Sequence, residues 1–337
     1  RTPAALDGAD VTSALRDRAG QLWFGTDGAG LARRNATGGW RVFTPASGLP
    51  SASVFALAEG PDGRVWAGTG AGAARVEPSG AFTTFNRARS DVGQGELGRV
   101  DALAVATSGE VWAVAQRNAF RIAAGAAEAV FDHDDNSFGV EALAATPNGV
   151  VWFGYETGLY QRTSIGIWID WTAPDPLPSG EITAIGADGD DVWFATAAGA
   201  VNWSAADGFR TWSAAADASH DFFFDMAVGT DGSVWHATGD GLITLLPDGE
   251  LVAHHVDAPL PLSYVAAVAL DAQGRPWIGT GPGGAGPYNL AWRGADGTWH
   301  GVALLNPWSG NLSYYIVDIA PARDGSLWIA GGDGLYH

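Results

Sequence analysis

The sequence has 337 residues, of which 47% are hydrophobic and 16% are charged, with 48 Gly and 17 Pro. This composition favours many short strands joined by tight turns and argues against disorder or coiled coil. The net charge of -19 argues against nucleic acid and anionic membranes as partners, because Lys and Arg supply that affinity. The sequence contains no Cys, which excludes disulfides and thiolate metal sites.

The ends and apolar runs of the chain bear on its location. The longest apolar runs, such as residues 222–224 and 314–316, are far shorter than the roughly 20 residues of a transmembrane helix. We therefore expect a soluble chain without direct membrane insertion. The sequence begins at Arg1, which fits either a shortened chain or a mature protein that has lost a signal peptide. We predict an exported protein, either extracellular or periplasmic.

One sequence frame recurs eight times. Each copy centres on a Trp that follows Leu or Val, or Pro in the seventh copy, and that is followed closely by small residues and often by Thr. The eight are Trp23, Trp66, Trp112, Trp152, Trp193, Trp235, Trp277 and Trp328. Their spacings of 40 to 51 residues are those of β-propeller blades and exclude the shorter ankyrin and leucine-rich repeats.

Each repeat predicts four antiparallel strands, A to D. An apolar run such as residues 54–58 precedes a turn such as 60–63, whose Asp-Gly supplies the positive φ of a hairpin, and the Trp strand follows. Segments such as 30–34 and 40–43 give two further strands. We expect the apolar strand A at the central axis, and the Trp of strand B between neighbouring sheets as packing core.

The two ends of the chain predict how the ring closes. The last repeat ends at His337 after its third strand, and residues 1–6 precede the first strand A at Val11. Residues 1–6 would supply the missing outer strand, which leaves no sheet edge unpaired. We predict an all-β fold in which residues 1–337 form a single eight-bladed β-propeller domain, closed by the N-terminal strand. A seven-bladed ring is the alternative.

A longer motif, Asp-x-x-Gly-x-hydrophobic-Trp-hydrophobic-Gly-Thr-x-x-Gly-Leu, is clearest at residues 17–31 and 62–72 and partial at 324–335. It resembles the two-component regulator propeller repeat. This resemblance implies an exported sensor or binding propeller, often one that recognises glycans. A more distant likeness, through Asp-Gly-x-hydrophobic-Trp, is to the streptogramin lyase propellers. That likeness implies a His and Glu pair in a central funnel, but no matching Glu can be assigned here.

Connections that depart from the repeat are the places where we expect function, because the strands are committed to packing. The connection between the second and third repeats gathers Arg87, Arg89 and Arg99 and predicts a basic rim loop. The next connection holds hard oxygen ligands that could hold Ca²⁺: Asp132, Asp134 and Asn136. It lacks the Gly and Glu of an EF-hand loop, so a solvated acidic turn, or a salt-bridged partner of the basic loop, is the alternative. We expect no other cofactor.

The sixth repeat contains the best candidates for catalysis. His220 precedes its strand A and His236 follows its Trp, so both could approach the central face. A carboxylate such as Asp221 or Asp225 beside either ring would allow general-base chemistry. Both His residues are weak catalytic candidates and also candidates for ligand contact.

Aromatic residues of the seventh repeat suggest a binding face. The Gly-rich segment 281–288 ends at Tyr288, and the following connection contains Trp308 and Asn311 with Tyr314 close behind. Rings beside an amide are typical of sugar binding. A slack insertion and blade packing are the alternatives. With His220 and His236, these residues predict a ligand-binding face on blades six to eight.

The sequence therefore predicts a non-catalytic, exported binding or sensor propeller that recognises a glycan, a peptide or a partner protein through its loop face. Two alternatives remain open. A structural subunit of a larger surface assembly would present a large apolar surface patch. A streptogramin-lyase-like enzyme would bring His220 and His236 together at a common water or metal.

Overall fold

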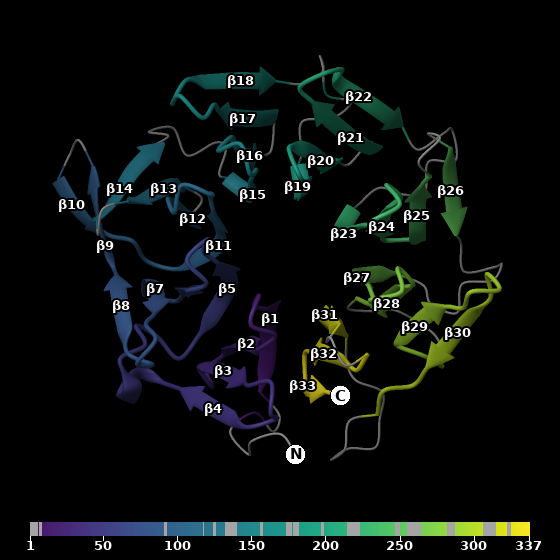
Figure 1. Cartoon of the computed structure of the whole chain (residues 1–337), viewed down its shortest axis with the longest axis horizontal. Coiled ribbons are helices and arrows are strands. Elements are labelled where there is room, and N and C mark those ends of the chain that lie inside the picture. The colour runs from purple at the N-terminus through teal and green to yellow at the C-terminus, as the bar shows by residue number, and fades with distance from the viewer. Residues whose placement is uncertain are drawn as a thin grey trace.

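The computed structural model describes residues 6, 9–90, 93–116, 118–123, 126–131, 140–155, 158–172, 177, 182–196, 199–213, 223–246, 250–254, 264–281, 287–305, 315–321 and 325–337. These residues form eight sheets arranged as blades around a central axis, and the strands of each blade pair antiparallel apart from one parallel pair in the third sheet (Figure 1). The predicted eight-bladed β-propeller is confirmed, and the seven-bladed alternative is wrong. Within the described residues, no helix has the length and hydrophobicity to cross a membrane.

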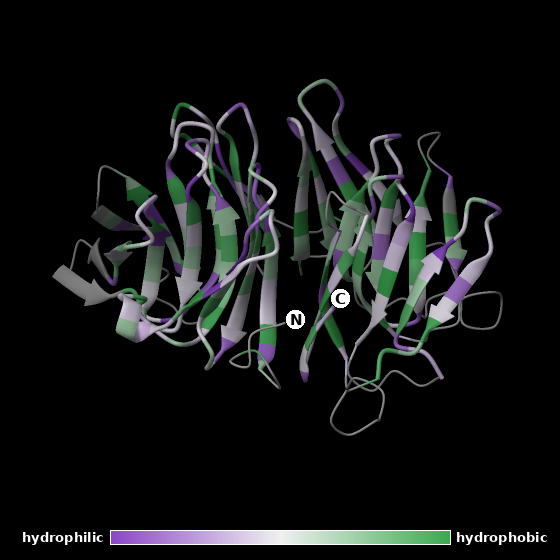
Figure 2. Ribbon diagram, turned by 60° about the horizontal axis from the view of Figure 1, so that its bottom comes forward, coloured by the Kyte–Doolittle hydropathy of each residue, from purple (hydrophilic) through white to green (hydrophobic). Residues whose placement is uncertain are grey.

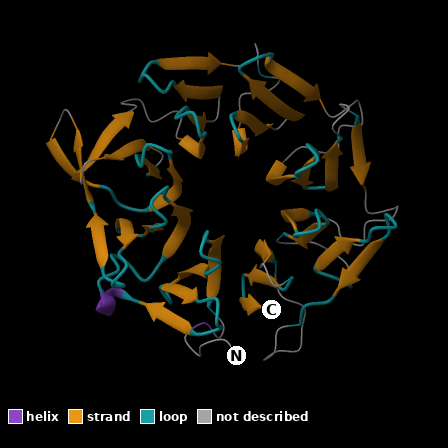
Figure 3. Cartoon of the chain, viewed as in Figure 1, coloured by secondary structure: helices purple, strands orange, loops and turns teal. Residues whose placement is uncertain are grey.

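The first four blades run from the inner strand outward, apart from an addition to blade 3. Blade 1 contains β1 (Asp10–Arg16), β2 (Leu22–Asp27), β3 (Leu31–Arg34) and β4 (Trp40–Phe43), and blade 2 contains β5 (Val54–Glu59), β6 (Val65–Thr69), β7 (Gly72–Val76) and β8 (Phe82–Phe85). Blade 3 contains β11 (Val100–Val105), β12 (Val111–Ala115), β13 (Asn118–Ala123) and β14 (Ala126–Phe131). Blade 4 contains β15 (Val140–Ala145), β16 (Val151–Tyr155), β17 (Gly158–Arg162) and β18 (Trp168–Thr172). A 3-10 turn, Pro45–Ser47, lies between blades 1 and 2 (Figure 3).

The last four blades follow the same plan. Blade 5 contains β19 (Ile182–Asp188), β20 (Asp191–Thr196), β21 (Gly199–Ser204) and β22 (Gly208–Ser213), and blade 6 contains β23 (Phe223–Val228), β24 (Val234–Thr238), β25 (Gly241–Leu245) and β26 (Leu251–His254). Blade 7 contains β27 (Val265–Leu270), β28 (Pro276–Thr280), β29 (Leu290–Arg293) and β30 (Trp299–Val302). Blade 8 contains β31 (Ile316–Pro321), β32 (Leu327–Gly331) and β33 (Gly334–Tyr336).

The repeated Trp residues pack between blades, as predicted. Trp23 of blade 1 belongs to a cluster with Val54 and Ala67 of blade 2, and Trp328 of blade 8 packs with Val11 of blade 1. Hydrophobic bands lie along the strands, and many hydrophilic residues lie in the connections (Figure 2). Each Trp except Trp193 packs against residues of the following blade in the same way.

The motif residues of blade 1 each satisfy a local requirement. The buried Asp17 carboxylate accepts hydrogen bonds from the indole N–H of Trp23 (2.8 Å) and from the backbone and side chain of Gln21 (2.7 and 3.1 Å). The Thr26 hydroxyl donates to the carbonyl of Gly30 (2.7 Å), which opens strand C with φ 93°. The sequence motif therefore records how one hairpin satisfies its buried polar groups.

Replacing Asp17 by Ala is expected to lower the free energy of unfolding by about 1–3 kcal/mol, because the Trp23 N–H loses its acceptor inside the core. Urea unfolding followed by Trp fluorescence measures the change. The Asp62→Ala variant provides a control, because Asp62 is exposed on the equivalent turn of blade 2 and should cost less. Equal losses in the two variants would contradict the role assigned to Asp17.

Blades 8 and 1 meet at the ends of the chain (Figure 1). Asp318 of β31 accepts a hydrogen bond from the backbone N–H of Ala14 (3.0 Å), and Arg16 donates to the carbonyl of Pro321 (3.1 Å). Leu6 is buried in the cluster that contains Trp328, and it lies in a 3-10 turn rather than a strand. Residues 1–5 lie outside the described residues, so the closing strand remains a prediction. The inner strands alone already tie the last blade to the first.

The predicted basic rim loop between blades 2 and 3 is wrong. Arg87 and Arg89 lie in β9 (Arg87–Ser90), which forms a hairpin with β10 (Gly93–Glu96) and pairs in parallel with the outer strand β14. This pairing uses the backbone groups at the edge of blade 3 and extends its sheet to six strands. Arg99 instead lies beside the innermost strand, so the three Arg residues do not share one loop.

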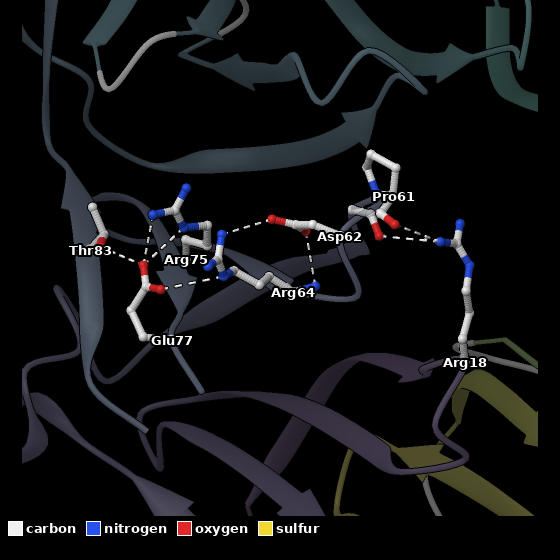
Figure 4. Close-up of polar contacts among 8 residues, drawn as sticks. Arg18, Pro61, Asp62, Arg64, Arg75, Glu77 and Thr83 are labelled. Atoms are coloured by element: carbon white, nitrogen blue, oxygen red, sulfur yellow. Dashed lines mark hydrogen bonds and ion pairs between the residues drawn. The ribbon is translucent and has the colours of Figure 1, made fainter. Parts of the chain in front are cut away.

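A polar network joins the outer strands of blade 2 (Figure 4). Glu77 accepts hydrogen bonds from Thr83 (2.6 Å) and Arg75 (2.9 Å), and these two groups hold the pKa of Glu77 below its usual value. Arg64 bridges Glu77 and Asp62 with N–O distances of 3.4 and 2.9 Å. The Arg residues of this blade are therefore already neutralised.

Candidate functional site

Every blade carries a β-bulge at the same place in its innermost strand. The register between strands A and B shifts after the first residue of strand A in seven sheets, and after the second residue, Val11, in blade 1, where β1 begins at Asp10. Bulges re-aim a side chain and are frequent next to functional sites. The residues at the bulge, here called the bulge ring, are Thr12, Phe55, Asp101, Glu141, Thr183, Phe224, Ala266 and Val317.

The bulge ring is chemically varied where its neighbours are uniform. The residue before each bulge is Val, Ile or Phe, and the residue opposite each repeated Trp is Ala, Gly or Leu. Packing therefore fixes those positions in every blade, whereas the bulge ring includes two Thr, two Phe, an Asp and a Glu. Among these positions of strand A, the bulge ring is therefore where the type of side chain differs most between blades.

Four members of the bulge ring line a cavity of about 490 Å³, here called the mouth cavity. It lies where the D-to-A connections enter the inner strands of blades 8, 1, 2 and 3. Its lining residues are Asp10, Val11, Thr12, Asp27, Phe55, Arg99, Asp101, Tyr315 and Val317. The volume suits a small polar ligand or one residue of a larger one.

Arg99, Asp101 and Phe55 form one side of the mouth cavity. The Arg99 guanidinium pairs with the Asp101 carboxylate at 2.6 Å and lies 3.8 Å from the centre of the Phe55 ring. Both charged side chains are about half exposed, so the pair can exchange these contacts for contacts with a ligand. The arrangement offers an acceptor, a donor and an aromatic face together.

Asp10, Asp27 and Tyr315 form the opposite side. Asp10 and Asp27 are direct partners across strands β1 and β2, and Ser53 donates a hydrogen bond to Asp27 (2.5 Å). Burial and then the charge of Asp27 raise the pKa of Asp10. Burial and then the charge of Asp10 raise the pKa of Tyr315. The three side chains therefore act on one another electrostatically.

Two further carboxylates stand where five other blades have Ala in strand A. Asp225 accepts hydrogen bonds from the N–H of Val268 (2.9 Å) and of Met226 (2.8 Å). Asp318 likewise accepts hydrogen bonds from the backbone N–H groups of Ala14 and Ile319. Each therefore joins its blade to the next one. Burial raises both pKa values, that of Asp225 to about 7 with a contribution from the charge of Asp318.

A second cavity, of about 410 Å³, opens at the A-to-B turns of blades 7, 8 and 1. Leu15, Leu270 and Ile319 contribute apolar groups to its lining, and Arg16 and Asp271 contribute the charges. Asp271 is already bonded to Arg275 (2.7 Å). The mouth cavity, with its three carboxylates, is therefore the stronger candidate.

The structure places only part of the site expected from sequence. Tyr288 is 38% exposed, and its ring lies against Gly301 of the outer strand β30, away from the inner strands. His220, Trp308, Asn311 and Tyr314, with the proposed Ca²⁺ ligands Asp132, Asp134 and Asn136, lie outside the described residues. The neighbour of Tyr314, Tyr315, lines the mouth cavity.

His236 is in the core. It has no exposed surface, and burial lowers its pKa to about 4. The equivalent residues Phe24, Phe153 and Phe194 pack against the Trp of the preceding blade. His236 thus occupies a position that faces the preceding blade in other repeats, where a ligand in the central channel cannot reach it.

Sequence reasoning missed the residues of the mouth cavity. Asp10, Asp27, Phe55 and Asp101 lie within strands, whereas unusual composition marks the connections of this chain. A partial signal was present, because the residue at the position of Phe55 and Asp101 varies from repeat to repeat, whereas the residue before it is always Val, Ile or Phe. The repeat pattern does not show the bulge. The bulge turns the residue after the core Val of strand A, such as Phe55 or Asp101, toward the cavity.

Two of the repeats match a described family of propeller repeats. The sequence profile of the family "Two component regulator propeller" matches residues 5–28 and 48–71. The predicted resemblance of these repeats is confirmed. Both segments of the regulator-propeller repeat contain the Trp-hydrophobic-Gly-Thr core of the motif. No curated protein matches the sequence significantly.

Solved structures share the fold. Streptogramin B lyase superposes with a TM-score of 0.59 at 15% identity, covering 99% of this chain and 94% of the lyase. Virginiamycin B lyase from Staphylococcus aureus gives 0.57 at 16% identity, covering 84% and 92%. PorZ, a surface component of the type-IX secretion system of Porphyromonas gingivalis, gives 0.58 at 16% identity, covering 97% of this chain and 52% of PorZ. The chain therefore spans about half of PorZ, and at these identities the likeness concerns the fold alone.

Proposed function

We propose that this protein is a non-catalytic, exported binding or sensor propeller whose ligand occupies the mouth cavity. The observation that carries the proposal is the cavity of about 490 Å³ lined by the variable bulge ring. Eight packed sheets supply a rigid frame, and the bulge ring supplies residues that packing does not require. A preformed polar pocket on a rigid frame is typical of ligand recognition.

The lining favours a small polar ligand or the end of a glycan or peptide. Three carboxylates accept hydrogen bonds, Arg99 donates them, and the Phe55 ring offers an apolar face. Rings beside charged hydrogen-bonding groups are typical of sites for hydroxylated ligands. The regulator-propeller repeat supports a sensor role, and the surface location stated for PorZ supports export.

The two other roles receive less support. A lyase mechanism built on His236 would need a base with access to substrate, and His236 has none. A structural subunit would need a continuous apolar patch. The exposed large apolar side chains in the described part of the chain are Ile165 (81%) and Ile167 (55%) in the β17–β18 turn of blade 4, and Leu305 (53%) and Tyr288 (38%) near the outer strands of blade 7. They are divided between blades 4 and 7.

Replacing Phe55 by Ala is expected to weaken ligand binding at least about tenfold, because the apolar face of the cavity is lost. A glycan and peptide screen by thermal shift, followed by calorimetric titration of each hit, measures the effect. The Tyr288→Ala variant is the matched control, since it removes an exposed ring far from the inner strands. Loss of binding in Tyr288→Ala but not in Phe55→Ala would move the site to the face predicted from sequence.

A further inference from the structure

Asp10 and Asp27 form an unfavourable pair. They are direct cross-strand partners in blade 1, and both line the mouth cavity. Like charges directly opposite each other destabilise a sheet. Burial and the charge of Asp27 raise the pKa of Asp10, as expected for carboxylates that repel each other. The presence of two carboxylates at these positions is therefore not explained by the stability of the sheet.

Blade 1 alone carries this pair. Asp10 directly precedes the core Val, Ile or Phe of strand A, and Asp27 lies four residues after the repeated Trp. No other repeat has carboxylates at both of these positions. The corresponding pairs are Ser53 and Gly70, Arg99 and Gln116, Gly139 and Glu156, Glu181 and Ala197, Phe222 and Gly239, Tyr264 and Gly281, and Tyr315 and Gly332. The fold therefore does not need acidic residues at these positions.

The cavity itself provides only part of what these carboxylates require. Asp27 receives the Ser53 hydroxyl, whereas Oδ1 of Asp10 is buried and has no hydrogen-bond donor among the described residues. Arg99, the cation of the cavity lining, is paired with Asp101. Two facing carboxylates that form no ion pair with a cation among the described residues are costly, so a cationic group from a ligand would stabilise the site.

The group that fits is a primary ammonium. It carries one positive charge and three N–H donors, which suit two carboxylates and the nearby Tyr315 hydroxyl. Tyr315 and Phe55 add rings to the wall of the same cavity, and rings attract cations. A Ca²⁺ ion would need six to eight oxygen ligands, and no three Asp, Glu or His side chains in the described part of the chain are grouped so that they could hold a metal ion.

We infer that Asp10 and Asp27 bind a primary ammonium group of the ligand in the mouth cavity. This inference rests on the function proposed above and narrows it to amine-bearing ligands. The amine belongs to an amino sugar or to a Lys side chain, and both present the same cation.

Calorimetric titration with matched probes tests the inference. The probes are a glucosamine trisaccharide and its N-acetylated form, and a Lys-containing tripeptide and its Nε-acetylated form. At least one free amine should bind about tenfold or more tighter than its acetylated partner, the range of a charge-assisted hydrogen bond. Asp27→Asn and Asp10→Asn should remove that preference. Asp62→Asn, which deletes an exposed carboxylate at the opposite face, should preserve it.

The outcomes separate the two proposals. Binding of both forms with equal affinity, or no binding of either amine while other ligands bind in a Phe55-dependent manner, overturns the ammonium site and leaves the binding function intact. Binding of Ca²⁺ alone that depends on Asp10 and Asp27 also overturns it. Ligands whose binding ignores Phe55→Ala overturn the proposed function itself. Titration at about 0.15 M salt limits non-specific attraction to the acidic surface.

Discussion

Replacing His236 by Phe is expected to stabilise the protein at acidic pH. Burial lowers the pKa of His236 to about 4, against about 6.5 in an unfolded chain. The stability that depends on the neutral ring is therefore present above pH 6.5 and is lost as the pH falls towards 4. The wild type should lose about 3 kcal/mol through this group, and the variant should not. Urea unfolding between pH 4 and 8 measures the difference.

Phe is a reasonable replacement because the repeat already uses it. Phe24, Phe153 and Phe194 fill the equivalent position in blades 1, 4 and 5. The core cluster between blades 5 and 6 has only two buried members within the described residues, Ala195 and Ile243, so added apolar volume should be accepted. His236→Ile offers a second variant, since blades 7 and 8 have Ile there. If both variants keep the acid sensitivity of the wild type, His236 is not its source.

The fold was predictable because its determinants repeat. Each blade must bury a Trp against its neighbour and satisfy the same hairpin, so one sequence pattern appears eight times. Trp23 and Trp328 follow this rule in the first and last blades. The N-terminal strand cannot be predicted in the same way, because residues 1–6 have no counterpart in the other repeats. The addition of β9 and β10 to blade 3 departs from the period, and the sequence there predicts a loop.

The site was less predictable because it depends on a side-chain direction that the pattern does not record. A bulge shifts the alternation of strand A by one residue, which turns Phe55 and Asp101 into the mouth cavity. The same one-residue uncertainty separates Tyr315, which lines the cavity, from Tyr314, which the sequence suggested. His236 was misplaced for a related reason, since the residue after each Trp faces the preceding blade rather than the axis.

Replacing Asp225 by Asn is expected to change the pH dependence in the opposite direction. Burial, with the charge of Asp318, raises the pKa of Asp225 to about 7, against about 3.9 in an unfolded chain. The stability that depends on the protonated carboxyl is fully present below pH 3.9 and is lost as the pH rises through 7. Across this window the wild type should lose at most about 4 kcal/mol of unfolding free energy through Asp225. The actual loss should be smaller, because the side chain keeps a little exposed surface and solvent screens its charge.

The difference in unfolding free energy between Asp225→Asn and wild type should therefore rise with pH between 4 and 7. Loss of one acceptor for the N–H of Met226 or Val268 shifts this difference by a constant and leaves its slope unchanged. Asp318→Asn is the matched control in blade 8, because it removes the charge that helps to raise the pKa of Asp225 and should move the transition to lower pH. A difference that stays flat from pH 4 to 7 would mean that Asp225 titrates normally and serves only to join blades 6 and 7.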